Sequence, residues 1–199
     1  ISTHALNIFG DHSDVMACRQ TGFAMMCETN PQEVMDLAPV AHLAAIEGKV
    51  PFLNFFDGFR TSHEIQKVAV WDYADLKEMC NMDAVAAFRK HALNPEHPAM
   101  RGSHENGDIF FQHREACNKF YNELPAVVEK YMGKVNEKLG TNYQLFNYYG
   151  APDADRIIIA MGSICDVAEE VIDYMNAHGE KVGIVKVRLY RPFCSDKLV

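Results

Sequence analysis

The chain has 199 residues, of which 48% are hydrophobic and 23% charged, and its formal net charge is −8 at pH 7. This length supports a buried core, and the composition excludes a disordered or collagen-like chain. The acidic balance argues against nucleic acid as a partner, and no apolar run approaches the roughly 20 residues of a membrane-spanning helix. We therefore expect a globular protein that binds neither nucleic acid nor membrane.

The first elements predicted are a short strand at residues 4–9 (HALNIF) and a turn at residues 10–14. A helix start with Ser13 or Asp14 as its N-cap is expected next. His12 lies in an Asp-His-Ser-Asp stretch whose residue types suit a triad or a metal site, but its spacing matches no motif with a known mechanism. Residues 15–27 predict a mixture of helix and loop.

A mostly buried helix is predicted from Glu33 to Glu47. Asn30 and Pro31 mark its start, because proline is favoured at the first helical position. Pro39 is expected to bend or split this helix, because it lacks an N–H group. Gly48 fits the residue just past the helix end.

Residues 50–56 (VPFLNFF) form a continuous apolar run, as expected of a parallel strand covered on both faces. Polar residues beyond the carboxyl end of such a strand are placed where open α/β sheets bind ligands or partners. We expect them to serve a domain or dimer interface or a solvated loop; they are Asp57, Arg60, His63 and Glu64. Arg19 is expected to anchor its own loop by hydrogen bonds, with phosphate binding as the alternative.

The middle of the chain predicts helices at residues 72–79 and 82–92, a loop-rich stretch at 94–107, and a helix at 114–137 that Pro125 divides. The second part of this last helix has one apolar face, formed by Val127, Val128, Tyr131, Met132 and Val135.

A strand–helix–strand unit is predicted after an extended aromatic stretch at residues 143–149. Its parts are a buried strand at 156–160, a helix at 164–177 and a parallel strand at 182–189, joined by a right-handed crossover. The inward face of the helix is expected to consist of Val167, Val171, Ile172 and Met175. Gly162 and Ser163 suit a plain turn better than a phosphate-binding loop, and Arg188 and Arg191 suit salt bridges better than coenzyme A binding.

The cysteines and histidines predict no metal or cluster site in this segment. The six cysteines form no CxxC or CxxxC pair, and the nine histidines form no HExxH or HxH motif. We expect free thiols buried among apolar residues rather than disulfides.

Three stretches resemble the pyruvate:ferredoxin (flavodoxin) oxidoreductases. They are HALNIFGDHSDVMACRQTGFAM at residues 4–25, PFLNFFDGFRTSHEIQK at residues 51–67, and YYGAPDADRIIIAMGS at residues 148–163 continued by KVRLYRPF at residues 186–193. They occur in the family's order and together cover nearly the whole chain. Because the matches are long and mostly free of gaps, chance similarity is a poor explanation for them.

The resemblance implies an α/β protein made of parts of two domains. Residues 1–144 would be the C-terminal part of a thiamine-diphosphate pyrimidine-binding-type domain with a parallel sheet. Residues 145–199 would be the truncated start of a domain like the transketolase C-terminal domain. The first residue, Ile1, and the helix start just before Val199 fit a piece of a longer chain.

The resemblance also implies a function for the longer enzyme. Such enzymes of anaerobic metabolism decarboxylate pyruvate oxidatively with thiamine diphosphate, Mg²⁺ and [4Fe–4S] clusters. They pass electrons to ferredoxin or flavodoxin, form acetyl-CoA from coenzyme A, and are usually homodimers. The expected compartment is the cytoplasm, or an anaerobic organelle such as the hydrogenosome in a protist.

No catalytic residue is carried over to this chain, because the family's catalytic positions are expected upstream of Ile1 or in later domains. Leu6 and Ile8 are expected either to form an apolar wall near the methyl group of pyruvate or to be ordinary core. We expect the 199-residue chain alone to be inactive, to bind no cofactor and to be poorly soluble, because uncovered strand edges and apolar helix faces favour association.

Two alternatives remain. The chain could belong to another thiamine-dependent 2-oxoacid oxidoreductase or a transketolase-like subunit, or it could be a non-catalytic interaction domain of the same fold. The sequence does not distinguish pyruvate from a neighbouring 2-oxoacid, ferredoxin from flavodoxin, or the source organism.

Overall fold

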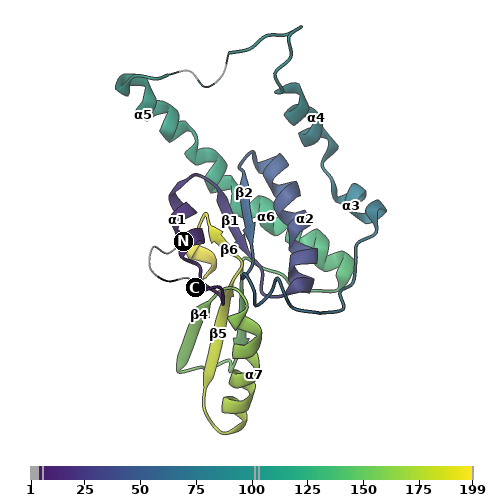
Figure 1. Ribbon diagram of the computed structural model, residues 1–199, viewed down its shortest axis with the longest axis vertical. Coiled ribbons are helices and arrows are strands. Elements are labelled where there is room, and N and C mark those ends of the chain that lie inside the picture. The colour runs from purple at the N-terminus through teal and green to yellow at the C-terminus, as the bar shows by residue number, and fades with distance from the viewer. Residues whose placement is uncertain (1–4, 6, 101, 103, 199) are drawn as a thin grey trace.

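The computed structural model describes residues 5, 7–100, 102 and 104–198. It contains two three-stranded sheets, one with strand order β2-β1-β6 and one with order β3-β5-β4 (Figure 1). The strands are β1 (Ala24–Cys27), β2 (Phe52–Phe55), β3 (Phe146–Gly150), β4 (Arg156–Ala160), β5 (Val182–Val187) and β6 (Leu189–Arg191). The α-helices are α1 (Ser13–Ala17), α2 (Pro31–Gly48), α3 (Tyr73–Met79), α4 (Met82–Lys90), α5 (Gly107–Ala116), α6 (Asn118–Leu139) and α7 (Ile164–Ala177), and two 3₁₀ helices are η1 (Cys18–Gln20) and η2 (Ser195–Lys197).

The first sheet is covered by helices α2 and α6 on one face. The alternate residues Ala24 and Met26 of β1 point into the core with these helices, whereas Met25 and Cys27 point to the other face. Strands β1 and β2 are parallel, but β6 pairs antiparallel with β1. The α/β class is therefore confirmed, with mixed sheets in place of the expected parallel one.

Strand β1 is the main element that the sequence pattern missed. The stretch before Cys27 was expected to be helix and loop, yet Ala24–Cys27 form the central strand and all four residues are buried. Alanine and methionine are weak β-formers, so burial between two neighbouring strands decides this local structure instead of propensity. The strand expected at residues 4–9 is absent from the described part of that stretch, residues 5 and 7–9; residues 4 and 6 lie outside the description.

Helix α2 starts as expected and continues through Pro39. The Asn30 side chain accepts a hydrogen bond from the Glu33 backbone N–H at 3.0 Å, and Pro31 occupies the first turn. Pro39 does not split the helix, so that part of the expectation was wrong. The carbonyl that Pro39 cannot serve belongs to Met35, four residues earlier, and it accepts a hydrogen bond from the Trp71 indole at 3.1 Å.

The end of α2 also differs from expectation. Gly48 is the last helical residue, and the left-handed residue after it is Lys49, with φ 57°. A Cβ atom on Gly48 would lie 2.4 Å from Leu124 Cδ1 of helix α6. Glycine is therefore needed here for the close packing of α2 on α6, and not for the turn. Helix α6 likewise runs through Pro125 undivided, with Val128, Tyr131, Met132 and Val135 buried as predicted and Val127 partly buried.

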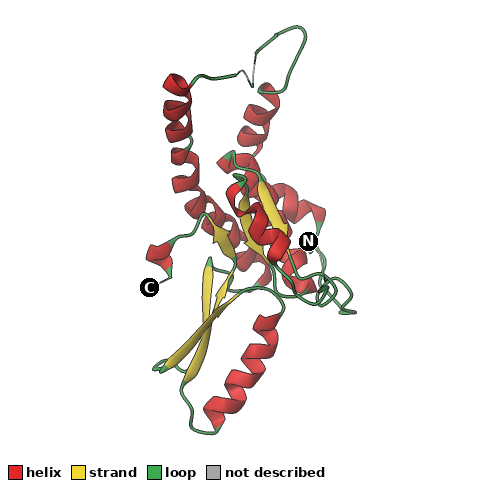
Figure 2. Ribbon diagram, turned by 60° about the vertical axis from the view of Figure 1, so that its left-hand side comes forward, coloured by secondary structure: helices red, strands yellow, loops and turns green. Residues whose placement is uncertain are grey.

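The second sheet contains the predicted strand–helix–strand unit. Strands β4 and β5 are parallel and α7 connects them, whereas β3 pairs antiparallel with β5 (Figure 2). Two expectations were wrong. Strand β4 was expected to be buried, but its three isoleucines are more than half exposed. Val167 and Val171 were expected to face inward, but they are 62% and 49% exposed. Ile172 and Met175 face the sheet as predicted, and the other two residues of this face are Cys165 and Ala168.

Other expected elements have close counterparts. Helices α3 and α4, the loop between α4 and α5, and the bounds of α7 follow the predictions. Helix α1 begins at Ser13, so the N-cap is His12 and not Ser13 or Asp14.

Arg188 joins the two sheets at the short break between β5 and β6. Its guanidinium is 2.5 Å from Glu33 Oε1 of α2 and also donates to the Asn147 side chain of β3. Its backbone carbonyl accepts from the N–H of Cys27 in β1. The Arg188 and Glu33 side chains are 5% and 8% exposed, so this is a buried ion pair, as the salt-bridge prediction for Arg188 required. The Arg191 guanidinium lies instead over the Tyr121 ring.

Glu28 lies beside this ion pair as a second buried carboxyl group. It is fully buried, and neither of its carboxyl oxygens has a well-formed hydrogen bond among the described residues. Burial, and then the charge of Glu33, raises the pKa of Glu28 to about 9, despite the opposing effect of Asn54 and Arg188. Glu28 is therefore a neutral acid at neutral pH.

Replacing Arg188 by leucine should destabilise the chain strongly, because Glu33 would remain as a buried charge without its partner. We expect a loss of about 3 kcal/mol, whereas Arg156→Leu, which removes an exposed pair with Glu180, should lose less than about 1 kcal/mol. Pulse proteolysis in urea at low protein concentration measures both variants. Equal losses would show that the buried pair does not connect the two sheets as described.

Replacing Glu28 by glutamine should change the pH dependence of stability. The folded pKa of about 9 lies above the ordinary value of 4.5, so the stability that the protonated acid contributes is present at low pH and is lost as pH rises towards 9. Between about pH 5 and about pH 8 the variant should therefore gain on the parent by up to about 1.4 kcal/mol per pH unit. The free energy of unfolding of parent, Glu28→Gln and the exposed control Glu170→Gln would be compared; parallel pH curves for the first two would contradict the buried neutral acid.

Candidate functional site

The candidate site is a cavity of about 710 Å³ at the carboxyl ends of β1 and β2, where the start of α7 closes it. Parallel strands of α/β sheets bind ligands at this edge. The residues lining it are Phe9, Gly10, His12, Thr29, Asp57, Arg60, Glu64, Met161, Ser163, Ile164, Asp166 and Val167. A neighbouring cavity of about 440 Å³ shares His12 and Asp57 and is also lined by Ile8, Phe59 and His63.

Asp57 is the central group of this site. Its side chain accepts hydrogen bonds from the backbone N–H of Ser163, at 2.6 Å, and from Nε2 of His12. It is 4% exposed, and burial alone would raise its pKa. The hydrogen bonds from Ser163 and His12 outweigh burial and hold the pKa of Asp57 below its usual range. Asp57 is therefore a carboxylate that links the end of β2 to the start of α7 and to the start of α1.

Gly162 makes this approach possible. Its φ is +83°, and a Cβ atom there would lie 2.8 Å from Asp57 Oδ2. Both the backbone conformation and the space exclude a side chain. The backbone of the turn between β4 and α7 is thus fitted to a carboxylate 105 positions earlier in the chain.

The loop after Asp57 is held by its own contacts. Phe59 has a φ of 65°, unusual for a bulky residue, and its N–H donates to Ser62 Oγ at 2.8 Å. Its ring stacks on His63 and meets the edge of Phe9, each at 4.7 Å between centroids. Thr61 is buried and donates to the Thr29 carbonyl at 3.2 Å. This loop is therefore a packed wall of the two cavities.

The structure brings together most of the residues singled out from the sequence. Arg60 and Glu64 line the larger cavity, and Ile8 and His63 line the smaller one. Ile8 is 45% exposed, so it is not ordinary core, and Leu6 lies outside the described residues. Arg19 lies apart from both cavities, where its guanidinium donates to the Met16 carbonyl at 2.6 Å.

Sequence reasoning missed the role of His12 and Ser163 as partners of Asp57. The Asp-His-Ser-Asp stretch and the Gly-Ser turn were both visible, but their common partner lies far from each of them in the sequence. Only the polar residues directly after a buried strand indicated where such groups would meet.

The buried thiols carry no reactive chemistry in this state. All six cysteines are free, and Cys27 and Cys165 are buried. Burial raises the pKa of the Cys165 thiol to about 11 and raises that of Cys27 further, so both stay protonated. Within the described ranges, no group of three or more His, Cys, Asp or Glu side chains is arranged to hold a metal ion. None of the helices in the described part of the chain combines the length and apolar character needed to cross a bilayer.

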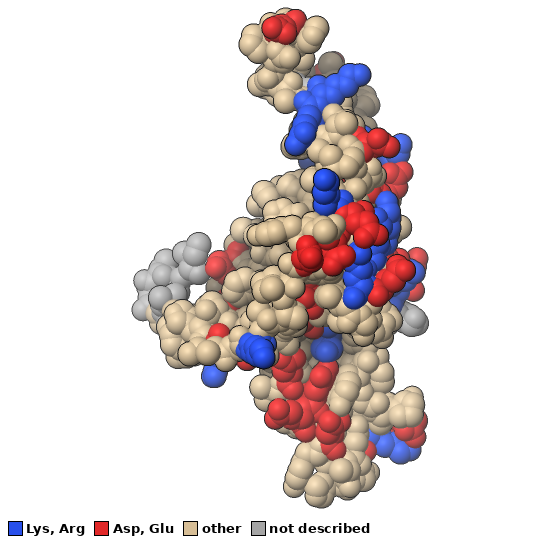
Figure 3. All heavy atoms as spheres, turned by 90° about the vertical axis from the view of Figure 1, so that its right-hand side faces the viewer, with Lys and Arg blue, Asp and Glu red and all other residues tan. Residues whose placement is uncertain are grey.

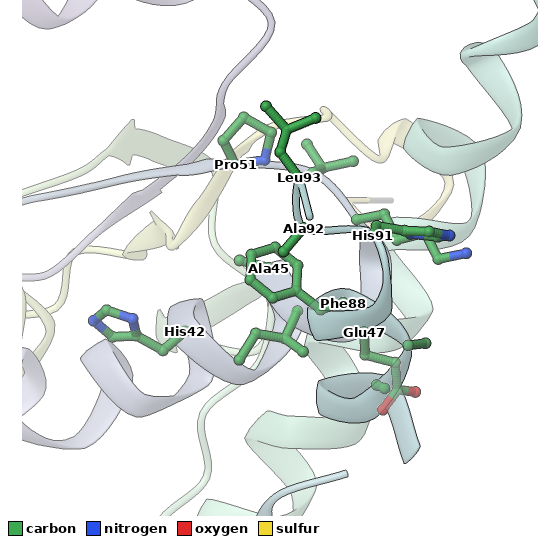
Figure 4. A pocket seen from close by; sticks show the side chains of 13 residues that line it. His42, Ala45, Glu47, Pro51, Phe88, His91, Ala92 and Leu93 are labelled. Atoms are coloured by element: carbon green, nitrogen blue, oxygen red, sulfur yellow. The ribbon is translucent and has the colours of Figure 1, made fainter. Parts of the chain in front are cut away.

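A rival cavity of about 680 Å³ lies between α2 and α4 (Figure 4). Its walls are mostly alanine and other apolar side chains. Glu47 lies on it, but its oxygens already bind Lys130 and Tyr131 at 2.6 Å. With few free polar groups that converge on it, this cavity is a weaker candidate for chemistry.

Acidic side chains are concentrated on the part of the surface that α7 forms. Acidic side chains gather over the lower part of the molecule, where α7 lies (Figure 3). The acidic residues of α7 are Asp166, Glu169, Glu170 and Asp173, and Asp166 lines the candidate site.

Known proteins place the chain in one family. A family profile described as "Pyruvate flavodoxin/ferredoxin oxidoreductase, thiamine diP-bdg" matches residues 1–133, and one described as "Pyruvate:ferredoxin oxidoreductase core domain II" matches residues 154–199. The chain is 61% identical over 193 residues to the pyruvate-flavodoxin oxidoreductase of Enterobacter agglomerans, covering 97% of this chain and 16% of that protein. It is 57% identical over 196 residues to the pyruvate:ferredoxin oxidoreductase of Moorella thermoacetica, covering 98% and 17%.

One further relative matches in sequence and one solved structure matches in fold. The pyruvate dehydrogenase [NADP(+)] of Cryptosporidium parvum is 48% identical over 200 residues, which cover 100% of this chain and 10% of that protein. A solved 2-oxoglutarate:ferredoxin oxidoreductase from Magnetococcus marinus matches with a TM-score of 0.58 at 16% identity, covering 100% of this chain and 37% of that one. The chain spans about a sixth of the length of the first two relatives and belongs to the pyruvate flavodoxin/ferredoxin oxidoreductase family.

Proposed function

We propose that residues 1–199 are part of a longer enzyme that oxidatively decarboxylates pyruvate to acetyl-CoA and CO₂ and passes the electrons to flavodoxin or ferredoxin. The observation that carries this proposal is the 61% identity to a pyruvate-flavodoxin oxidoreductase across 97% of the chain. The names of these relatives specify pyruvate as the substrate, which favours it over other 2-oxoacids. Their acceptors differ between flavodoxin, ferredoxin and NADP(+), so the acceptor is assigned only as a class.

The described residues do not by themselves fit thiamine diphosphate. The cofactor's diphosphate needs a divalent cation, and the described ranges contain no acidic cluster that could hold one. Its ring needs a carboxylate that faces it, but the buried carboxyl of Glu28 lines neither the larger nor the smaller cavity. The Asp57 carboxylate lines both cavities and is already bonded to Ser163 and His12. We therefore assign the cofactor, Mg²⁺ and the [4Fe–4S] clusters to the rest of the longer enzyme and derive no catalytic step from this chain.

The role proposed for this chain is to build and orient one wall of the active-site chamber. Asp57 fixes the start of α7 against the ends of β1 and β2, and the loop after it packs on Phe9. Ile8 supplies an apolar surface in the smaller cavity, which suits the methyl group of a small 2-oxoacid. Arg60 and Glu64 are proposed to contact a neighbouring domain or subunit across the larger cavity.

The oligomeric state and the cellular compartment are also proposals about the whole enzyme. A homodimer that binds coenzyme A is inferred for the whole enzyme, in the cytoplasm or an anaerobic organelle. A non-catalytic interaction domain would explain the fold equally well, but not the high identity to enzymes named for one reaction.

Replacing Asp57 by asparagine should loosen the start of α7, because the Ser163 and His12 hydrogen bonds would lose a charged acceptor. Bonds to charged groups contribute about 1.5–3 kcal/mol, so we expect the amides at the start of α7 to exchange about tenfold or more faster in the whole enzyme. Glu170→Gln, which changes an exposed carboxylate of α7, is the matched control. Unchanged amide hydrogen exchange near Ser163 would show that Asp57 does not hold the start of α7 against the end of β2.

The whole gene product should reduce a one-electron viologen dye when given pyruvate, coenzyme A, thiamine diphosphate and Mg²⁺. The 199-residue chain alone should show no turnover under the same conditions, because its described residues contain no acidic cluster that could hold the cation that the cofactor requires. A stronger reaction with 2-oxoglutarate than with pyruvate would overturn the substrate. Turnover by the 199-residue chain alone would overturn the assignment of the catalytic groups to other parts of the enzyme.

A further inference from the structure

Strand β4 is an edge strand with apolar side chains on both faces. It ends the order β3-β5-β4, so one of its sides carries no paired strand in the described chain. Ile157, Ile158 and Ile159 are 51%, 57% and 59% exposed. Ile158 pairs in register with Ile184 of β5, which is fully buried on the same face. A continuous run of β-branched residues is typical of an interior parallel strand, whose two faces are both buried. Such a run is unusual in an edge strand whose side chains are exposed.

Helix α7 carries a second apolar side beside the one that packs on the sheet. Val167, Val171 and Tyr174 are 62%, 49% and 65% exposed. They are spaced by four and three residues, so they lie along one side of the helix. This spacing is that of a helix that packs against another helix.

The two exposed surfaces lie on the same side of this unit. Glu169 and Asp173 of α7 bind Lys186 of β5 and Tyr149 of β3, at 2.5 and 2.8 Å, so the acidic side of the helix faces β3. Residues 167, 171 and 174 project from the opposite side of the helix, towards β4. Because α7 packs over β5 and β3, Ile158 is left uncovered next to this apolar side.

One kind of occupant satisfies both surfaces. A strand paired with the free side of β4 would bury Ile157 and Ile159, and the helix connected to it would cover Ile158 and pack against Val167 and Val171. The surface formed by these side chains contains no charged group, which argues against a charged ligand. The chain spans only 16–17% of its relatives' length, so most of the polypeptide that could supply such a segment lies outside residues 1–199.

We propose that the β4–α7 surface (Ile157, Ile158, Ile159, Val167, Val171 and Tyr174) is covered by a strand and helix from the same polypeptide, outside residues 1–199. This inference rests on the proposal that the chain is part of a longer enzyme. A second copy of the chain is the competing occupant, because two β4 edges could pair with each other.

Photo-crosslinking in the whole gene product tests the proposal. A benzophenone amino acid would replace Val171 in one variant and its exposed neighbour Glu170 in the control. The Val171 variant should form a crosslink within one polypeptide, to a peptide outside residues 1–199, and should exceed the control. Mixing isotopically labelled and unlabelled protein separates links within a chain from links between chains.

Three results would overturn the proposal: a crosslink to residues 157–174 of a second copy, a crosslink only within residues 1–199, or no excess over the control. Hydrogen exchange gives an independent measurement. In the whole product the β4 amides should exchange about as slowly as those of the paired strand β5, whereas exchange about a hundredfold faster would show a free edge and overturn the proposal. Pyruvate oxidation is assayed on the same preparations, so an active enzyme without the crosslink would reject the surface while leaving the proposed function intact.

Discussion

The buried pair between Arg188 and Glu33 is the constraint on which the rest of the structure depends. A charge in a protein interior is tolerated only when a partner and further hydrogen bonds satisfy it. Here the carboxylate also accepts from the Thr29 N–H at 3.0 Å, and the guanidinium also binds Asn147. These bonds fix the start of α2 relative to the place where the chain passes from one sheet to the other.

Asp57 forms a second link between the two sheets, and it too is a buried charge satisfied by hydrogen bonds, here from Ser163 and His12. The apolar core under α7 is separate from the larger core around α2 and α6. Phe146 of β3 and Val187 of β5 nevertheless lie in the larger core, so apolar packing and the directional bonds of Arg188 and Asp57 together set the angle between the two sheets. The larger cavity lies beside the second of these links, so its shape depends on both.

Much of the fold was predictable from local signals. Asn30 and Pro31 gave the start of α2, and the alternation of apolar and acidic residues gave α7 within its observed bounds. Strand β1 was not predictable, because its residues have no strong strand preference and its burial comes from partners far along the chain. The role of Gly48 was misassigned, because a glycine is needed there for close contact with Leu124 of α6 and not for a turn. For the site, the polar residues after β2 were found, but their pairing with His12 and Ser163 was not encoded in any local spacing.

The position of β6 has a consequence for how the protein is made. Strand β1 needs β6 on the side opposite β2, yet β6 leaves the ribosome only after residues 28–188 have been synthesised. Until then the nascent chain presents an open row of backbone N–H and C=O groups beside a fully apolar strand, which is the kind of surface that other chains or chaperones bind. Completion of the first sheet is thereby postponed until the second has been translated.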